Sequence, residues 1–470
     1  MTAVDFLRSS GAVLRRNITR HPLLFLAACT LACYVPSFAG PFQFDDFGVI
    51  VNESAVHSFT AWREAAGSGL RPLLKLTYMI NWVTGLGPPG FHLLNLIIHI
   101  VNVLLVAALC SAANRYGTEV PRFSFAICWF AAAFLFALHP VQTEAVTYIC
   151  GRSASLMTFW YCASLLCYIR GIRSGRPLLW AGAAPLLFMA AVLTKEAAMT
   201  LPAALLIWEI CIEKTKARLL LTRQLVWWTL LAIPCYYVIM HPGYYRLLYG
   251  VVGERSFDEA LLYQVKGVFY LLSRLVMINR LSIEPGLGSH PPGAAPALIE
   301  SILLLVISAS ALAVRRKLPA VSFGILWFLL HTFIPYVFLP RRDVLNEHHM
   351  YLANAGLFCA IGYLSGILWE MPRWRKFINP AMTVVCCLLM VQTVLRNLDY
   401  RSEVALWEST IRVSPDSPTA YNNLGVAYQL AGRLPEARLA YTRALMREPA
   451  FDKARRNLEK LLRSEQAPTR

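Results

Sequence analysis

Charged residues are scarce in this chain. Only 15% of its 470 residues are Asp, Glu, Lys or Arg, whereas 57% are hydrophobic and the mean hydropathy is +0.50. A soluble globular protein carries about 25% charged residues. The scarcity therefore excludes an ordinary soluble enzyme and indicates a protein that crosses the lipid bilayer several times.

The chain also lacks any Cys-x-x-Cys motif, although it contains 12 cysteines. Most of these cysteines lie inside apolar runs, which is typical of small buried hydrophobic side chains rather than of disulfides or metal ligands. The adjacent Glu347, His348 and His349 suggest zinc, but they match no recognised ligand spacing. The sequence thus argues against a disulfide framework and against a zinc domain.

Acidic residues are fewer than basic ones, 27 against 44, which gives a net charge of +17. The basic residues fall in short clusters between apolar runs, for example at 170–173, 214–218, 315–317 and 373–376. Such clusters are typical of the cytoplasmic ends of membrane helices. We therefore expect contact with the lipid bilayer and no binding of nucleic acid.

Eleven apolar runs are long enough for membrane helices, which need about 20 residues each; they lie near 21–39, 92–113, 123–139, 153–169, 178–194, 197–212, 223–240, 297–314, 319–339, 351–369 and 377–395. With the basic clusters in the cytoplasm, residues 1–20 are cytoplasmic and 21–398 form the transmembrane domain. Its loops 40–91 and 241–296 are then external. Residues 261–279 could also span, but that would move two basic clusters outside, so we expect interfacial or re-entrant helices there.

The last part of the chain has the pattern of a tetratricopeptide repeat. Tyr421, Leu424, Gly425 and Tyr428 are followed at the expected spacing by Ala437, Tyr441, Ala444 and Pro449, and Trp407 precedes Tyr441 by 34 residues. We predict a short repeat domain over 399–470, on the external side, with 452–464 as a capping helix. Isolated repeats bury too little surface to be stable, so we expect this domain to dock on the membrane domain or to pair with another molecule.

Two adjacent carboxylates, Asp45 and Asp46, follow the first apolar run and lie between Phe44 and Phe47. Mutual repulsion and aromatic neighbours both raise a carboxyl pKa, which would make either group a usable general base. The pair could instead bind a divalent cation, Mg²⁺ or Mn²⁺, beside a phosphate, or it could be a solvated loop.

Four further polar clusters fall on the same predicted side of the membrane. Arg71 and Lys75, at i and i+4 of an expected helix, could hold a phosphate. In the same cluster, His92 begins a polar stripe with Asn95, His99 and Asn102, which suits either interhelical hydrogen bonds or a pocket lining. The remaining groups are His139, Glu144 and Arg152, then Lys195 and Glu196, and finally Arg341, Arg342, Glu347, His348 and Tyr351.

The order of these motifs resembles the transmembrane and tetratricopeptide-repeat O-mannosyltransferases and their bacterial relatives. The matching elements are FDD, RPL, FHLLNLIIH, HPVQTEAV, GRS, TKE and a Glu347–Tyr351–Leu352 element, followed by the repeats. The chain departs from the family with Gln142 and His348, where His and Arg are usual, and with Ala353, where Pro is usual. The departure at His348 moves the expected phosphate contact toward Arg341 or Arg342.

The resemblance implies an all-α polytopic fold of the C type of glycosyltransferases (GT-C) and an inverting transfer of mannose or another hexose from a polyprenyl-phosphate carrier. The implied acceptor is a Ser or Thr hydroxyl of a protein that the repeats at 399–470 bind. Asp45 would take the proton, Asp46 would orient the acceptor or a metal, and the polar clusters would bind the donor. The implied location is a bacterial inner membrane with the site facing the periplasm, or the ER membrane of a eukaryote.

Other functions are compatible with the same residues. The chain could be a non-catalytic membrane scaffold that presents its repeats, or a transferase that acts on a glycan or lipid. A flippase for the same lipid is disfavoured, because the charges cluster at one surface instead of near the middle of the membrane.

Overall fold

The computed structural model describes residues 21–114, 122–244, 256–287, 293–338 and 345–466. Every regular element in these ranges is a helix, so the all-α prediction is confirmed. The eleven apolar runs fall on helical segments of α2 (Pro22–Tyr34), α5 (Gly87–Asn114), α6 (Arg122–Leu138), α8 (Arg152–Ser174), α9 (Ala184–Thr194), α10 (Leu201–Trp208), α11 (Ala217–Met240), α14 (Ala294–Val314), α15 (Pro319–Phe338), α16 (Met350–Glu370) and α17 (Pro372–Asp399).

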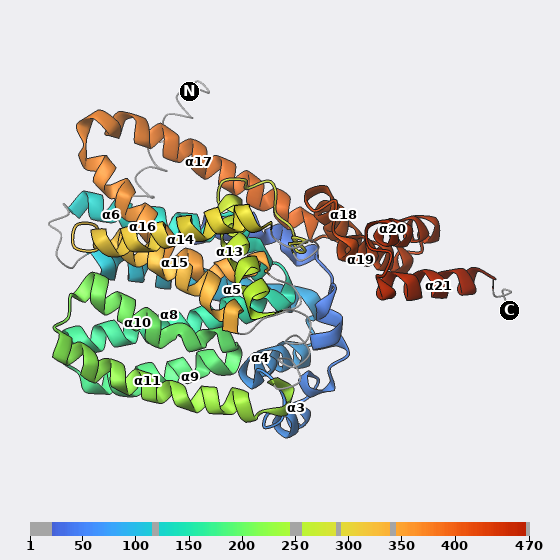
Figure 1. Ribbon diagram of the computed structural model, residues 1–470, viewed down its shortest axis with the longest axis horizontal. Coiled ribbons are helices and arrows are strands. Elements are labelled where there is room, and N and C mark those ends of the chain that lie inside the picture. Colours follow the sequence, from blue (N-terminus) through green and yellow to red (C-terminus); the bar gives the residue numbers. More distant parts are fainter. Residues whose placement is uncertain (1–20, 115–121, 245–255, 288–292, 339–344, 467–470) are drawn as a thin grey trace, which may run out of the picture.

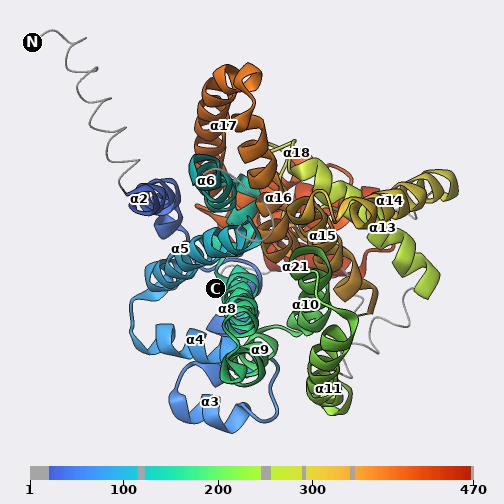
Figure 2. The same ribbon diagram turned by 90° about the vertical axis from the view of Figure 1, so that its left-hand side faces the viewer.

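The protein is an integral membrane protein. Within the described ranges, seven helices are long and apolar enough to cross a membrane, and the pair Ala126–Leu138 and Pro140–Val146, bent by 54°, would add an eighth. Viewed end-on in Figure 2, α15 and α16 lie near the centre, whereas α11, α14 and α17 project outward. These three helices expose most of their apolar surface, which suits contact with lipid. The number of spans predicted from the sequence, eleven, stays a prediction.

The helix α13 (Phe257–Arg274) covers the segment whose membrane crossing was in question. It begins at Ser256 with a capping box, in which Ser256 and Glu259 bond each other's backbone N–H. It carries four charged residues and is not among the helices that meet the length and hydropathy criteria. Its properties agree with an interfacial or re-entrant helix, which stays a prediction.

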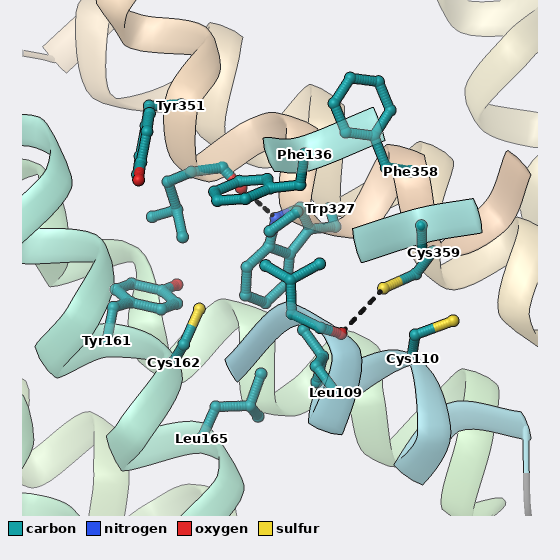
Figure 3. Close-up of a cluster of buried hydrophobic side chains, with 14 of the residues drawn as sticks. Leu109, Cys110, Phe136, Tyr161, Cys162, Leu165, Trp327, Tyr351, Phe358 and Cys359 are labelled. Carbon is teal, nitrogen blue, oxygen red and sulfur yellow. Dashed lines mark hydrogen bonds between the residues drawn. The ribbon is translucent and has the colours of Figure 1, made fainter. Parts of the chain in front are cut away.

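Small residues allow the central helices to pack closely. A Cβ atom at Gly362 of α16 would lie 2.2 Å from the Cys128 carbonyl oxygen of α6, and one at Gly356 would lie 2.4 Å from Trp327 of α15. Figure 3 shows part of the buried hydrophobic cluster between the central helices, with Phe136, Tyr161 and Trp327 among its large side chains. The Trp327 indole N–H donates to the Leu352 carbonyl at 2.8 Å, so the buried polar atom is satisfied.

The predicted repeat domain consists of α18 (Glu403–Val413), α19 (Pro418–Leu430), α20 (Leu434–Arg447) and α21 (Asp452–Gln466). Gly425 leaves room for the ring of Tyr441, which would lie 2.5 Å from a Cβ atom there. Tyr148 and Ile283 of the membrane domain share an apolar cluster with Trp407 and Leu424, so the repeats dock on the membrane domain. Figure 1 shows them at the right-hand end, opposite the turns that join α10 to α11, α14 to α15 and α16 to α17.

Candidate active site

The two aspartates of the first loop have different surroundings. Phe44 adopts a left-handed conformation, with φ of 48°, immediately before the pair. Asp46 is 1% exposed, and its two oxygens accept hydrogen bonds from the backbone N–H groups of Gln43 and Cys150, both at 2.9 Å. Burial raises the pKa of Asp46 to about 7 against the pull of these N–H groups, and repulsion by Asp45 adds little. The rise predicted from the sequence is therefore confirmed for Asp46, with burial as its main cause.

Asp45 is exposed and lines a cavity of about 280 Å³. Its backbone N–H donates to the hydroxyl of Tyr148 at 3.0 Å, which fixes the loop against the membrane domain. The ring of Phe44 meets the ring of Trp407 edge-on at 5.2 Å. The cavity is lined by Phe44, Asp45, Glu144, Tyr148, Ile283, Glu284, Asn346, His348, Trp407, Thr419, Asn422, Asn423, Phe451 and Lys453. It therefore lies between the outer loops of the membrane domain and the repeats.

Glu144 and His348 meet in this cavity although 204 residues separate them. Glu144 belongs to α7 (Thr143–Val146) and His348 to the short helix η9 (Glu347–His349). The His348 Nδ1 atom lies 2.6 Å from Glu144 Oε1, and the His348 backbone N–H donates to Glu144 Oε2 at 3.0 Å. The two contacts together fix the orientation of the imidazole. His348 also lines a second, small cavity with Lys195 and His349.

Glu347 and His139 connect this arrangement to α13 and the segment that follows it. Glu347 is buried and accepts hydrogen bonds from the Ser282 backbone N–H at 2.9 Å and from the Tyr270 hydroxyl at 3.2 Å. The Nε2 atom of His139 lies 3.2 Å from the Leu275 carbonyl oxygen. Both residues thus attach the segment after α13 to the site, and neither lines the cavity beside Asp45.

Arg71 and Lys75 do not share a helical face, which corrects the expectation from the sequence. Arg71 precedes α4 (Pro72–Val83) and has a left-handed conformation, with φ of 55°, so it lies outside the helix that carries Lys75. Its guanidinium makes two hydrogen bonds to Glu196, at 2.6 and 3.0 Å. The Lys75 ammonium lies 2.8 Å from Glu53. Both cations are already paired with carboxylates, and neither lines the cavity beside Asp45.

Arg152 has no exposed surface, which corrects its expected contact with the lipid phosphate. Its Nε donates to Asn95 at 2.6 Å, Nη2 donates to the Phe91 carbonyl at 3.0 Å, and Nη1 donates to the Thr77 carbonyl at 3.1 Å. The guanidinium carbon lies 4.9 Å from the centre of the Tyr78 ring. A buried arginine needs such partners, so its role here is to hold three helices together.

The polar stripe on α5 provides interhelical hydrogen bonds. His92 Nε2 lies 3.1 Å from the Gly40 carbonyl oxygen, and His99 shares a hydrogen bond of 2.6 Å with the Tyr351 hydroxyl. Asn102 donates to the Ser155 carbonyl at 2.8 Å. Tyr351 has no exposed surface. Of the two alternatives, helix packing is the one observed, and His92 and Tyr351 are buried and bonded to other parts of the protein.

A metal site is not formed by the residues described. No group of three or more His, Cys, Asp or Glu side chains lies close enough to hold a metal in these ranges. Each oxygen of Asp46 accepts one N–H group and keeps a further lone pair, so the divalent cation, Mg²⁺ or Mn²⁺, stays a prediction. Arg341 and Arg342 lie outside the described residues.

Several residues of the cavity were missed by sequence reasoning. Tyr148, Asn422, Asn423 and Lys453 line it together with Asp45, yet nothing in the repeat pattern indicates which helix edge meets the membrane domain. One available signal pointed to Tyr148, because it lies two residues after the HPVQTEAV element.

Comparison with known proteins connects this geometry to one class. No protein-family model matches the chain, and no solved structure matches it. The curated relatives named here are called protein O-mannosyl-transferases, which confirms the resemblance seen in the motifs. The chain is 24% identical to Tmtc3 of Drosophila melanogaster over 91% of its length, 23% identical to human TMTC3 over 88%, and 24% identical to human TMTC4 over 86%. It spans 55%, 50% and 63% of these proteins, respectively.

Proposed function

We propose that the protein is an inverting glycosyltransferase that moves mannose or another hexose from a polyprenyl-phosphate carrier to a Ser or Thr hydroxyl of a protein. The observation that carries the proposal is the cavity of about 280 Å³ that Asp45 lines together with Glu144, His348 and residues of the repeats. Its volume is near the lower end of the range for small-molecule sites, about 300–1,000 Å³. One sugar ring with an incoming side chain is a suitable occupant.

Asp45 is suited to be the general base. It is the exposed carboxylate of the pair, and its backbone is fixed by Tyr148 at 3.0 Å. In the proposed reaction the acceptor hydroxyl attacks the anomeric carbon and gives its proton to Asp45. The bond between that carbon and the phosphate oxygen breaks, and the lipid phosphate leaves with the electron pair. A single displacement inverts the anomeric centre.

The leaving phosphate needs positive charge as its negative charge develops. Lys195 and His348 line the small cavity adjoining the first, and His348 lines both. Contact with the lipid phosphate is therefore assigned to these two side chains, together with Arg341 and Arg342 as the sequence predicts. Glu144 acts through His348, whose imidazole it orients at 2.6 Å.

The acceptor would enter from the repeats. Asn422 and Asn423 of α19 and Lys453 of α21 line the same cavity as Asp45. Asparagine amides both donate and accept hydrogen bonds, which suits the backbone of an extended peptide. Two basic clusters support an external location of the site. The cluster at 315–317 lies in the turn between α14 and α15, and the cluster at 373–376 lies at the start of α17; both are at the end of the molecule opposite the repeats (Figure 1). The site would face the periplasm in a bacterium, or the ER lumen in a eukaryote.

The proposal is tested with purified protein in detergent, polyprenyl-phosphate mannose or glucose, and peptides that contain Ser or Thr. Mass spectrometry is expected to detect the mass of one added hexose on the peptide. The anomeric configuration of the hexose transferred from deuterium-labelled donor should be opposite to its configuration in the donor. Transfer to a lipid or glycan but not to any peptide would overturn the protein acceptor. Absence of transfer from every lipid-linked hexose would favour the scaffold function instead.

A further inference from the structure

A third and larger cavity, of about 830 Å³, lies where the membrane domain meets the repeats. Its walls are the segment after α13 (278–281), the last two turns of α17 (Gln392–Asp399) with Arg401, and α18 from Ala405 to Val413 with Pro415 beyond it. The helix α17 is a candidate membrane span that ends at Asp399. The cavity is therefore at the level where a lipid headgroup would be.

Positive charge dominates this cavity. Arg280, Arg396, Arg401 and Arg412 line it, against two carboxylates, Asp399 and Glu408. Asp399 lies 3.1 Å from Arg396 and 3.8 Å from Arg412, so one carboxylate is shared by two arginines. Within the described ranges, Arg280 and Arg401 are exposed and make no ion pair.

Arg396 contributes a buried charge that is only partly compensated. Its side chain is 5% exposed, and Nη1 donates to Asp399 at 3.1 Å and to Ser409 at 3.2 Å. Its Nε and Nη2 have no hydrogen-bond partner among the described residues. A buried cation with two unpartnered donors is costly, so an anion at this place would stabilise the protein.

The membrane-facing rim of the same cavity is apolar. Leu395 and Leu398 of α17 line it and are 50% and 41% exposed. Val276 and Met277, which precede the lining residue Ile278, are 83% and 45% exposed. Exposed apolar side chains beside arginines suit a membrane lipid, because its acyl chains would contact the apolar side chains and its phosphate would contact the arginines.

We propose that this cavity binds the phosphate headgroup of an anionic membrane lipid, whose acyl chains lie along the outer turns of α17. Arg280 and Arg401 contact the phosphate, and Arg396 and Arg412 add to the field. Because the walls come from both domains, the bound lipid holds the repeats against the membrane domain. The occupant is a bilayer lipid rather than the sugar carrier, since this cavity and the one beside Asp45 have no lining residue in common.

The test is native mass spectrometry of the full chain in detergent with phosphatidylglycerol or phosphatidylcholine. The double variant Arg280→Ala/Arg401→Ala is compared with Arg438→Ala/Arg443→Ala, which removes the same charge from exposed arginines on α20. Each arginine near an anionic lipid is worth about fivefold in binding, so the first variant should bind phosphatidylglycerol roughly 25-fold more weakly. The control variant should match the wild type, and thermal melting without lipid should show that both variants are folded.

Three outcomes would overturn the proposal: equal binding by the two variants, equal binding of phosphatidylcholine, or displacement of phosphatidylglycerol by polyprenyl phosphate. The last would mean that the carrier lipid occupies the cavity. Simultaneous adducts of both lipids on one molecule support two separate sites. Transfer assays on the same samples separate this proposal from the proposed function. Lipid binding tests only the cavity described here, whereas hexose transfer tests only the proposed enzyme activity.

Discussion

Asp46→Asn removes the buried carboxyl beside the cavity, and its effect should depend on pH. The pKa of Asp46 is about 7 in the folded protein against 3.8 for an ordinary aspartate, a difference that corresponds to about 4 kcal/mol. Between pH 4 and pH 7 the unfolded chain loses this proton while the folded protein keeps it. The contribution of Asp46 to the free energy of unfolding is thus fully present below pH 4, falls as the pH rises, and levels off above pH 7.

The Asn variant lacks this dependence but has its own cost. One of the two N–H groups, of Gln43 or Cys150, would face an amide NH₂ and lose its acceptor, which costs about 1–3 kcal/mol at every pH. We expect Asp46→Asn to be less stable than the wild type at pH 4 and to gain about 4 kcal/mol relative to it by pH 7. Chemical denaturation in detergent at a series of pH values measures this difference. Asp416→Asn, at an exposed position, is the matched control and should show no such trend.

Parallel stability curves for the wild type and Asp46→Asn between pH 4 and pH 7 would refute the reasoning. They would mean that Asp46 is ionised at an ordinary pH in the folded protein. The loop would then be solvated, and the difference between the two aspartates, on which their assigned roles depend, would be lost.

The remaining predictions concern packing and the acceptor. Gly362→Ala should destabilise the protein by about 1–3 kcal/mol, since its Cβ would lie 2.2 Å from the Cys128 carbonyl oxygen. In the control Gly182→Ala, the Cβ would lie 3.4 Å from its nearest neighbour, so thermal melting should change little. Arg152→Lys loses hydrogen bonds worth about 1.5–3 kcal/mol each, so it should lower Tm while the KM for the donor stays the same; a raised donor KM at unchanged Tm would contradict its structural role. Lys453→Ala should raise the KM for the acceptor peptide about twofold to tenfold and leave the donor KM unchanged, and the reverse pattern would place the sugar carrier at the repeats.

Patterns with a local physical cause were predictable from the sequence. Apolar runs indicated helices because length and hydropathy alone decide whether a helix can exist in lipid. The spacing of Trp407 and Tyr441 indicated the repeats, because each aromatic side chain needs a small partner, as Gly425 is for Tyr441. The convergence of Asp45, Glu144 and His348 followed from placing their loops on one side of the membrane.

Pairing was not predictable, because it depends on residues that are distant in the sequence. Arg71 and Lys75 were taken for phosphate ligands, yet Glu196 and Glu53 bind them. Arg152 was expected to bind the donor because it follows the HPVQTEAV element closely, but its hydrogen-bond partners belong to other helices. A sequence shows that a charge in a membrane protein needs a partner, while the fold decides whether that partner is protein or ligand.

The central claim is that Asp45 removes the proton of the acceptor hydroxyl. The most direct measurement is the rate of hexose transfer from a polyprenyl-phosphate hexose to a Ser/Thr peptide by purified Asp45→Asn, with Asp416→Asn as the control. We expect Asp45→Asn to lose about 10²–10⁴-fold in kcat while it retains donor binding, and we expect the control to be as active as the wild type. Transfer by Asp45→Asn at the wild-type rate would contradict the claim.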